Sequence, residues 1–467
     1  MKLAGVPLTL ITAIIHLLCL PTSANEIDSA KQQHEYNVDD CIRVAIEANA
    51  QILQAETKVQ QWLARLNEVE STYWPKLNAI TYIAPMYTVR GNVDNYETRW
   101  RKLQDWGPYT HLKATLSLPL YSFGRVEAGA KAAASRAAVE QARVREARNA
   151  VILEVKRFYY NRLFALSMLP SLQSAADTVK EALEYANKVY AEGSGEVTQV
   201  DLAKLQYAQS QVEKYLLISE NNISNATAAL KHTMGIADHT EIIFTDKTLP
   251  AIPDDFKITL AQAVLIASKQ RPEWAEIQQG KTAALALAQA EKLANAPTLF
   301  TAGEFSYDWA PTRDDSTNPY LSDRYNDIFA GVAVGFKFDL DPALSKAKEQ
   351  NAQALVSETE ALDRFAKTGI PLQVKKAHND TMHYGALDIV AKQGVKATKR
   401  WLTFSASAYT TGLGEARNVI EGLASYLQAR RDYLENVQNY FIARAELDYA
   451  MGVDPLNIEQ SYSLLKK

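Results

Sequence analysis

The protein has 467 residues, of which 47% are hydrophobic and 22% are charged, with 50 basic and 54 acidic side chains. This composition is typical of a folded protein, and the length is enough for about three ordinary domains. The formal net charge of −4 argues against the basic surface of a nucleic-acid-binding protein. Of the two cysteines, Cys19 lies in an N-terminal apolar run, so the mature chain would keep Cys41 alone and form no internal disulfide.

The first residues have the pattern of an export signal. Lys2 precedes an apolar run from Val6 to Leu20, and the small residues up to Ala24 offer a cleavage site. We therefore predict that residues 1–24 are a signal peptide and that the mature protein works outside the cytoplasm. No run of 18 apolar residues follows Ala24, which predicts no transmembrane helix. If the mature chain crosses a membrane, it does so with β-strands.

The mature chain repeats one pattern twice. Pro75 and Pro297 are each followed two residues later by leucine, and Tyr190-Ala-Glu-Gly193 resembles Tyr409-Thr-Thr-Gly412 further along. Matches that keep their order over such distances predict two copies of one unit. We place the first repeat at 25–235, a linker at 236–255, the second repeat at 256–452 and a C-terminal tail at 453–467.

Each copy is expected to contain one helix, two alternating segments and two further long helices. The predicted helices cover 38–74, 124–191 and 200–234 in the first copy, and 260–295, 342–408 and 418–451 in the second. Pro170 and Pro371 are expected to kink or break the longest helices, because proline removes a backbone donor and clashes with the preceding turn.

The longest helices are too long for a compact domain. A helix of about 70 residues is ~100 Å long, whereas a compact domain of this chain length has a radius of gyration of ~23 Å. The pattern therefore predicts either the wall of a tube or an elongated rod such as a spectrin-like bundle.

Four segments alternate between apolar and polar residues, at about 77–90, 109–121, 299–309 and 328–340. In the second of them, Leu112, Ala114, Leu116, Leu118 and Leu120 share one face. About ten residues of such alternation suit a transmembrane β-strand, and they also suit a soluble hairpin with one wet face. Because four strands cannot close a barrel, a membrane-spanning arrangement would require several chains to share one.

The signal peptide, the duplication, the paired strands between long helices and the glycine-containing helical turns resemble those of the TolC-like outer membrane efflux proteins. The resemblance covers essentially the whole mature chain. It implies a mainly α fold with a small transmembrane β part, in which three chains share a twelve-stranded β-barrel and an α-helical tunnel. It also implies an outer membrane protein of a Gram-negative-type cell that extends into the periplasm.

The same resemblance implies a function and partners. The protein would be a passive exit duct of a tripartite efflux or type I secretion system. Its partners would be two further copies in a homotrimer, outer membrane lipid, a periplasmic adaptor (membrane fusion protein) and an inner-membrane pump, with no nucleic acid.

The resemblance extends to one helical tip. In the family, a Tyr-x-x-Gly turn precedes a helix that opens with two acids around the closed pore. Here Tyr409 and Gly412 match the turn, Glu421 matches the second acid, and Asn418 stands in place of the first. The resemblance thus implies a pore constriction at Asn418 and Glu421 with one acidic ring. The alternative for Glu421 is an ordinary charge near a helix start, which the helix dipole stabilises.

The rest of the tip follows the family less closely. Gly414 stands where the family has an arginine that helps to lock the tip, and Arg417 lies nearby. The implied tip lock and turn are Tyr409, Gly412, Gly414 and Arg417. The implied adaptor-docking tips are Gly193, Gly195, Glu196, Leu413 and Glu415, and Asp201 is the equivalent acid of the first repeat.

No motif for catalysis is present in the sequence. It contains neither a phosphate-binding loop nor a nucleophile elbow, and His378 and His383 do not have the spacing of a zinc-protease pair. We therefore predict no enzymatic activity, cofactor or metal. The competing interpretation is a secreted or surface-attached helical scaffold or adhesion protein. A periplasmic adaptor is a weaker alternative, because it would be expected to show additional β-rich domains.

Overall fold

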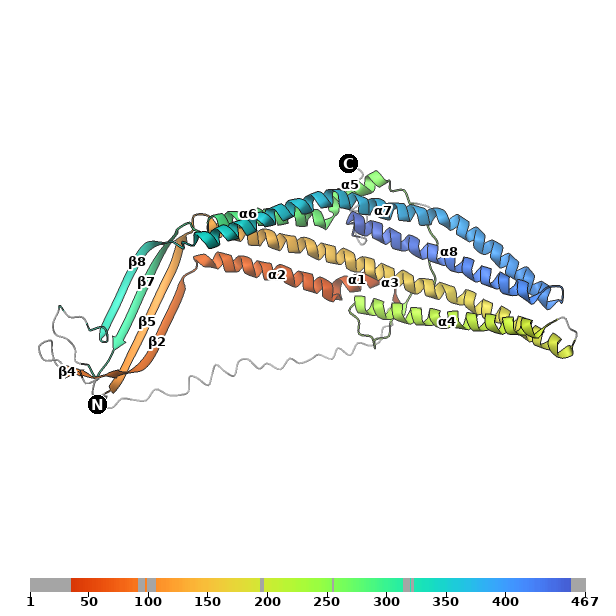
Figure 1. The fold of residues 1–467 in the computed structure, drawn as a ribbon, viewed down its shortest axis with the longest axis horizontal. Coiled ribbons are helices and arrows are strands. Elements are labelled where there is room, and N and C mark those ends of the chain that lie inside the picture. The colour runs from red at the N-terminus through yellow and green to blue at the C-terminus, as the bar shows by residue number, and fades with distance from the viewer. Residues whose placement is uncertain are drawn as a thin grey trace.

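The computed structural model describes residues 35–90, 97–98, 106–193, 197–253, 256–313, 320 and 323–454. These residues form an elongated molecule with a four-stranded sheet at one end and two helical hairpins at the other (Figure 1). The predicted signal peptide, Gly195, Glu196 and residues 455–467 of the predicted tail lie outside the described residues.

The two halves of the chain contribute the same elements in the same order. The first half contains α1 (Val38–Ala48), α2 (Ala50–Glu70), β2 (Lys76–Tyr87), β5 (Trp106–Tyr121), α3 (Arg125–Glu192) and α4 (Gln199–Thr233). The second contains α5 (Leu260–Gln270), α6 (Pro272–Lys292), β7 (Thr298–Trp309), β8 (Asp327–Lys337), α7 (Pro342–Thr410) and α8 (Ala416–Met451). This confirms the predicted fold, a duplicated unit of long helices and two strands.

Short elements complete the description. Strand β1 (Glu35–Tyr36) pairs in parallel with β6 (Ile243–Phe244), which ties the start of the first repeat to the linker. Strands β3 (Val89–Arg90) and β4 (Glu97–Thr98) form a small hairpin beyond the sheet. A single 3₁₀ turn, η1 (Ser71–Tyr73), leads from α2 into β2.

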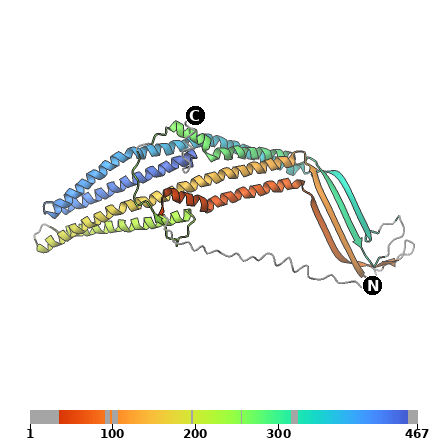
Figure 2. The ribbon, with the colours of Figure 1, turned by 180° about the vertical axis from the view of Figure 1, so that it is seen from behind.

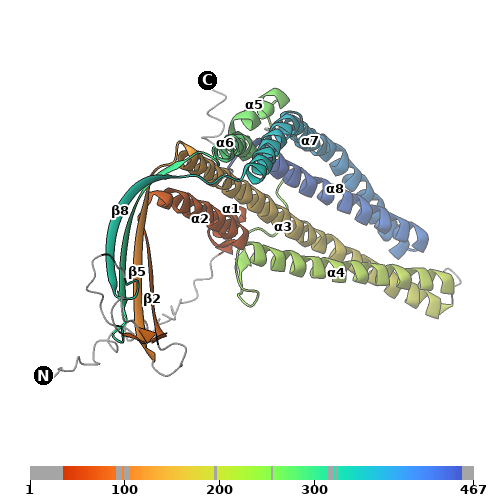
Figure 3. The same ribbon diagram turned by 60° about the vertical axis from the view of Figure 1, so that its left-hand side comes forward.

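The helices form a wall rather than a globule. Helices α3 and α7, of 68 and 69 residues, run its whole length and are each ~100 Å long. Helices α2 and α4 follow one another along one side of α3, and α6 and α8 lie between α3 and α7 (Figures 1 and 3). Across the wall the order is α2 or α4, then α3, then α6 or α8, then α7.

The prediction of single helices over 38–74 and 260–295 is wrong, because each is split in two. Asn49 has an extended backbone, and its side chain accepts a hydrogen bond from the Gln51 backbone at 2.8 Å, which starts α2 afresh. The same side chain donates to the Thr233 carbonyl at 2.8 Å. In the second half, Arg271 takes the corresponding place and Pro272 opens α6. These junctions are the joints where α2 meets α4 and α6 meets α8.

Of the two effects expected of proline in the longest helices, a kink or a break, the structure contradicts the break. Pro170 lies inside α3 and Pro371 inside α7, and both helices continue through them. A proline removes one backbone bond of its helix. Packing of buried neighbours such as Leu172 and Val374 against adjacent helices holds both sides of the interruption together.

The sheet is antiparallel throughout, in the order β2-β5-β7-β8. The halves of the chain meet at the β5–β7 pair, and β2 and β8 remain as unpaired edges. Strand β2 continues the α2 side of the helical wall and β8 continues the α7 side (Figure 2). None of the helices in the described part of the chain combines the length and hydropathy needed to span a bilayer.

The core lies in the seams of the wall. One cluster near its middle gathers residues of α1, α3 and α4, and a second gathers residues of α5, α7 and α8. A third joins both hairpins at their tips. Alanine is frequent among the buried residues of α3, which lets neighbouring helices approach closely on two sides.

Candidate functional site: the hairpin tips and the two faces of the sheet

The α3–α4 turn depends on one glycine and one capping pair. Gly193 ends α3 with a φ of 68°, a conformation that glycine adopts without strain. Thr198 then caps α4, because its hydroxyl accepts from the Asp201 backbone at 3.2 Å while the Asp201 carboxylate accepts from the Thr198 backbone at 3.1 Å. The Thr198 hydroxyl also donates to that carboxylate and lowers its pKa. Asp201 is therefore a helix-capping acid in this chain.

The α7–α8 turn is tighter and leaves less space. Gly412 has a φ of 77°, and the Leu413 backbone donates to the Ala408 carbonyl at 2.9 Å. A Cβ on Gly414 would lie 3.0 Å from the Tyr409 nitrogen, so an arginine would not fit at this position without a shift. The Leu413 side chain is 88% exposed at the extreme tip.

The two tips pack against each other through aromatic rings. Tyr409 of α7 is 4% exposed, and its ring lies 5.2 Å from that of Tyr185 of α3 in an edge-to-face arrangement. Burial, then the nearby negative charge of Asp201, raises the pKa of Tyr409. None of the described residues forms a hydrogen bond with its hydroxyl. Tyr409 thus joins the hairpins by ring packing within one chain.

The predicted constriction residues lie on the first turns of α8. Asn418 and Glu421 are both exposed. The Glu421 carboxylate accepts a hydrogen bond from the Arg417 guanidinium at 2.7 Å, and this bond raises the pKa of Arg417. Sequence analysis placed Arg417 near the tip but missed this pair, although the i, i+4 spacing signals it.

A groove opens beside the tips between the two hairpins. It encloses about 320 Å³, and α3 supplies Met168 and Leu172 at its floor. Its walls come from α4 and α8 and include Tyr207, Tyr215, Leu423 and Leu427. Its lining is mostly apolar and its sides are helices.

The outward face of the sheet is apolar across all four strands. The register places Thr81, Leu112, Tyr307 and Ile328 in one row. Neighbouring rows on this face contain Leu77, Leu116, Phe305, Val332 and Val334, and most of these large side chains are exposed. A wide, continuous and exposed apolar face is unusual for a protein surrounded by water.

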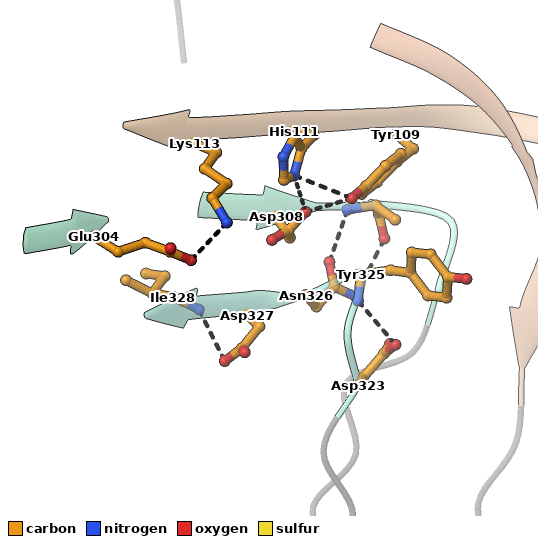
Figure 4. A network of polar contacts seen from close by, with 11 residues as sticks. Tyr109, His111, Lys113, Glu304, Asp308, Asp323, Tyr325, Asn326, Asp327 and Ile328 are labelled. Carbon is orange, nitrogen blue, oxygen red and sulfur yellow. Dashed lines mark hydrogen bonds and ion pairs between the residues drawn. The ribbon is translucent and has the colours of Figure 1, made fainter. Parts of the chain in front are cut away.

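The opposite face carries the polar residues of the same strands. Lys113 of β5 pairs with Glu304 of β7 at 2.8 Å. At the end farthest from the helices, the His111 Nδ1 lies 2.6 Å from the Asp308 Oδ1, and the Tyr109 hydroxyl donates to the same carboxylate (Figure 4). Ion pairs and hydrogen bonds therefore order this face, together with ring contacts such as that of Tyr82, whose ring lies 4.8 Å from that of His111.

The loop between β7 and β8 is fixed where it leaves the sheet. The Asn326 side chain accepts from the Ala310 backbone at 2.8 Å and donates to its carbonyl at 3.3 Å (Figure 4). The Arg313 guanidinium donates twice to Asp323, and its Cζ lies 4.6 Å from the centre of the Tyr325 ring. These contacts tie the two ends of the loop to each other at the edge of the polar face.

The lateral edges of the molecule carry the remaining exposed apolar side chains. Phe365, Leu372 and Val390 of α7 lie on one face of that helix and are exposed. Val200, Tyr207 and Ile218 are exposed in the same manner on α4, at the opposite edge. In the part of the chain that the structure describes, no group of three histidine, cysteine, aspartate or glutamate residues is arranged to hold a metal ion.

Comparison with known proteins agrees with this geometry. Residues 41–235 match the model of a family described as outer membrane efflux protein. No curated protein matches the sequence.

Several solved structures share the fold. The outer membrane channel CmeC of Campylobacter jejuni is 16% identical, with 91% of this chain and 89% of that chain covered and a TM-score of 0.73. The outer-membrane channel OprN is 12% identical, with 89% and 90% covered and a TM-score of 0.72. The outer membrane protein VceC of Vibrio cholerae is 15% identical, with 89% and 96% covered and a TM-score of 0.69.

Proposed function

We propose that this chain, which has the sequence pattern of outer membrane efflux proteins over residues 41–235 and their channel fold over its described length, is the exit duct of an export system. It lies in the outer membrane and reaches into the periplasm. It is a passive conduit that performs no chemistry of its own. Nothing in the fold or the comparisons favours the helical scaffold or adhesion protein.

One observation carries this proposal. The molecule is a curved wall with two unlike edges, and each edge leaves an unpaired strand beside an exposed apolar helix face. Strand β2 with α2 and α4 forms one edge, and β8 with α7 forms the other. Such unlike edges join head to tail and close into a ring. Because β2 and β8 run in opposite directions, their union would continue the antiparallel sheet.

Three copies give a duct of workable size. Twelve strands spaced ~4.8 Å apart and tilted ~40° close into a barrel about 24 Å across its backbone. Twelve helices spaced ~9 Å apart form a tunnel about 35 Å across. The apolar row of Leu112, Tyr307 and Ile328 would face lipid, and the face with Lys113 and Glu304 would line the pore.

The tips are the proposed gate and docking end. Asn418 and Glu421 would meet their copies around the axis, with Arg417 moderating the acidic charge. Tyr409 and the turn at Gly412 and Gly414 would hold the closed tip, as the ring packing supports. The tip residues Gly193, Leu413 and Glu415, together with Gly195 and Glu196, would receive a periplasmic adaptor bound to an inner-membrane pump. The apolar groove beside them suits an amphipathic helix of such an adaptor.

Electron microscopy of the mature protein purified in detergent tests the proposal. The expected particle is a threefold tube with a helical stem ~100 Å long and a detergent belt around the sheet. Monomeric rods, or a protein that stays dispersed without detergent, would contradict both the shared barrel and the outer membrane location.

A further inference from the structure

Charge is unevenly distributed along the polar face of the sheet. The four strands place three acids on this face, Glu304, Asp308 and Asp327, and three bases, Lys76, Lys113 and Lys337. The numbers of acids and bases are equal, but the two kinds of charge lie at different ends of the face. Asp308 and Asp327 lie at the end farthest from the helices, whereas Lys76 and Lys337 lie at the helix end.

The central charges neutralise each other. Lys113 pairs with Glu304 at 2.8 Å, so the middle of the face carries no net charge. At the helix end, Lys337 pairs with Asp339 at 3.1 Å. Lys76 is exposed and forms no ion pair with any of the described residues. Among the charged residues of the four strands, Lys76 is therefore the one without an ion pair at this end, and the Arg125 guanidinium, which donates to the Thr298 hydroxyl at 3.2 Å, adds a second positive charge there.

The outer end keeps two acids side by side. Asp308 and Asp327 occupy directly opposite positions on β7 and β8, an arrangement that like charges disfavour. The Tyr109 hydroxyl and His111 Nδ1 both contact the Asp308 carboxylate and hold it in place (Figure 4). Asp327 is exposed, and its carboxylate accepts from the Ile328 backbone at 3.0 Å. This row therefore places two carboxylates side by side in each chain.

The two ends act separately on a passing solute. Six residues separate the row of Lys76 and Ser117 from the row of Tyr82 and His111, which is ~20 Å along a strand. Charges in ~0.1 M salt are screened over ~10 Å. An ion near one end therefore responds to that end alone, while the field of each end reaches across much of the bore.

We propose that the barrel lumen is electrically polarised, with an outer mouth that favours cations through Asp308 and Asp327 and a helix end that favours anions through Lys76. This inference rests on the proposed function, because it takes the polar face to line the pore. It assigns a charge selection step to the membrane-spanning part of the duct, separate from the helical tip. Cationic solutes would be concentrated at the exit.

Charged thiol reagents measure this field at chosen positions. The mature chain keeps only Cys41, which is fully buried, and burial followed by the charge of Asp40 raises the pKa of its thiol to about 12. Cys41 is therefore not expected to react with the reagents, and the introduced cysteines are the only reactive thiols. Phe329→Cys places a reporter two residues from Asp327, and Ser117→Cys places one opposite Lys76.

The measurement compares a cationic with an anionic methanethiosulfonate on assembled trimers. At each reporter, the cation-to-anion rate ratio in 0.1 M salt is divided by the ratio in 1 M salt, which removes steric differences. We expect a value above one at Phe329→Cys and below one at Ser117→Cys. A local potential of about one kT changes the ratio about sevenfold between reagents of opposite unit charge.

Neutralising variants assign the effect to the named residues. Asp308→Asn keeps an oxygen for Tyr109 and His111, and Asp327→Asn serves as a second variant on an exposed site. Each of these two variants should bring the value at Phe329→Cys toward one and leave the value at Ser117→Cys unchanged. Lys76→Gln should bring the value at Ser117→Cys toward one and leave that at Phe329→Cys unchanged. Equal values at both reporters would overturn the inference. In particles that remain threefold tubes, that result would leave the proposed duct standing.

Discussion

At the scale of residues, Arg417 changes the charge that Glu421 presents to an ion. Sequence analysis assigned Glu421 to a ring of acids, and the structure places a guanidinium 2.7 Å from its carboxylate. In a single chain, an ion at a distance from this pair therefore experiences almost no net charge. The negative charge of the proposed ring therefore depends on whether Arg417 stays paired with Glu421 in the assembled protein.

Opposite changes at this pair should shift ion selectivity in opposite directions. Glu421→Gln should weaken the preference of the channel for cations, and Arg417→Gln should strengthen it, because the carboxylate is then unpaired. The reversal potential of a reconstituted channel across a potassium chloride gradient measures both. Glu358→Gln, on α7 outside the tip, is the matched control. Reversal potentials that stay unchanged in both variants would remove the pair from the pore.

Substitutions at Tyr409 distinguish whether its ring or its hydroxyl holds the tip closed. Tyr409→Phe keeps the ring against Tyr185 and removes a buried hydroxyl that has no partner among the described residues. We expect a stability change within about 1 kcal/mol and a tip that stays closed. Tyr409→Ala should cost about 3–5 kcal/mol, as for other large buried side chains, and should raise the conductance. A Phe variant that conducts like the Ala variant would show that the hydroxyl holds the tip.

The joints of the wall are the main feature at the scale of elements. In the first half, the Asn49 side chain both begins α2 and holds the last turn of α4. In the second half, Arg271 begins α6 and reaches Gln373 of α7 at 2.5 Å and the Ala450 carbonyl of α8 at 3.4 Å. The duplicated unit thus uses different chemistry at equivalent joints.

Two substitutions at Asn49 separate its two roles. Asn49→Asp keeps the oxygen that caps α2 and loses the donor to the Thr233 carbonyl, so its cost should be about 1–3 kcal/mol. Asn49→Ala also loses the cap, which should add about 1 kcal/mol. Denaturant unfolding of the assembled protein compares them, with Asn37→Ala at the start of α1 as the control for a cap alone. An Asp variant as stable as the parent would show that the Thr233 contact contributes nothing.

At the scale of the whole molecule, the exposed apolar face of α7 distinguishes a subunit from a monomer. Phe365 and Leu372 are 74% and 66% exposed in one chain. Within the proposed ring they would be covered by the next copy. The same reasoning applies to the unpaired strands β2 and β8.

A charge placed on this face should disrupt assembly without unfolding the chain. Leu372→Glu should release monomers, because an unpaired charge buried in an interface costs several kcal/mol. Sedimentation in detergent measures the oligomeric state, and circular dichroism checks that the helices persist. Lys396→Glu, an exposed change elsewhere on α7, should remain assembled. Intact oligomers of the Leu372→Glu variant would place the interface elsewhere.

The sequence by itself determined the features that depend on neighbouring residues. Period-two alternation predicted the strands, and the long helices were predicted over ranges close to those observed. The glycines at the turns, such as Gly193 and Gly412, signalled their ends because a left-handed backbone favours glycine. Ordered repeats predicted the duplication, and the resemblance to outer membrane efflux proteins agrees with the fold and with the match over residues 41–235.

Only the tertiary structure decided which surfaces meet. The helix splits at Asn49 and Arg271 have local signals, the Asn49 cap and Pro272, which sequence analysis did not use. What the sequence could not show is that helices about 180 residues away contact the same two residues. The contact between His111 and Asp308 joins residues 197 apart, and the strand register that creates it is set by pairing between the two halves. Helix and strand periods follow from local backbone geometry. Contacts between residues far apart in the sequence depend on how whole elements pack, so the burial of Tyr409 and the uneven charge of the polar sheet face appear only in the folded molecule.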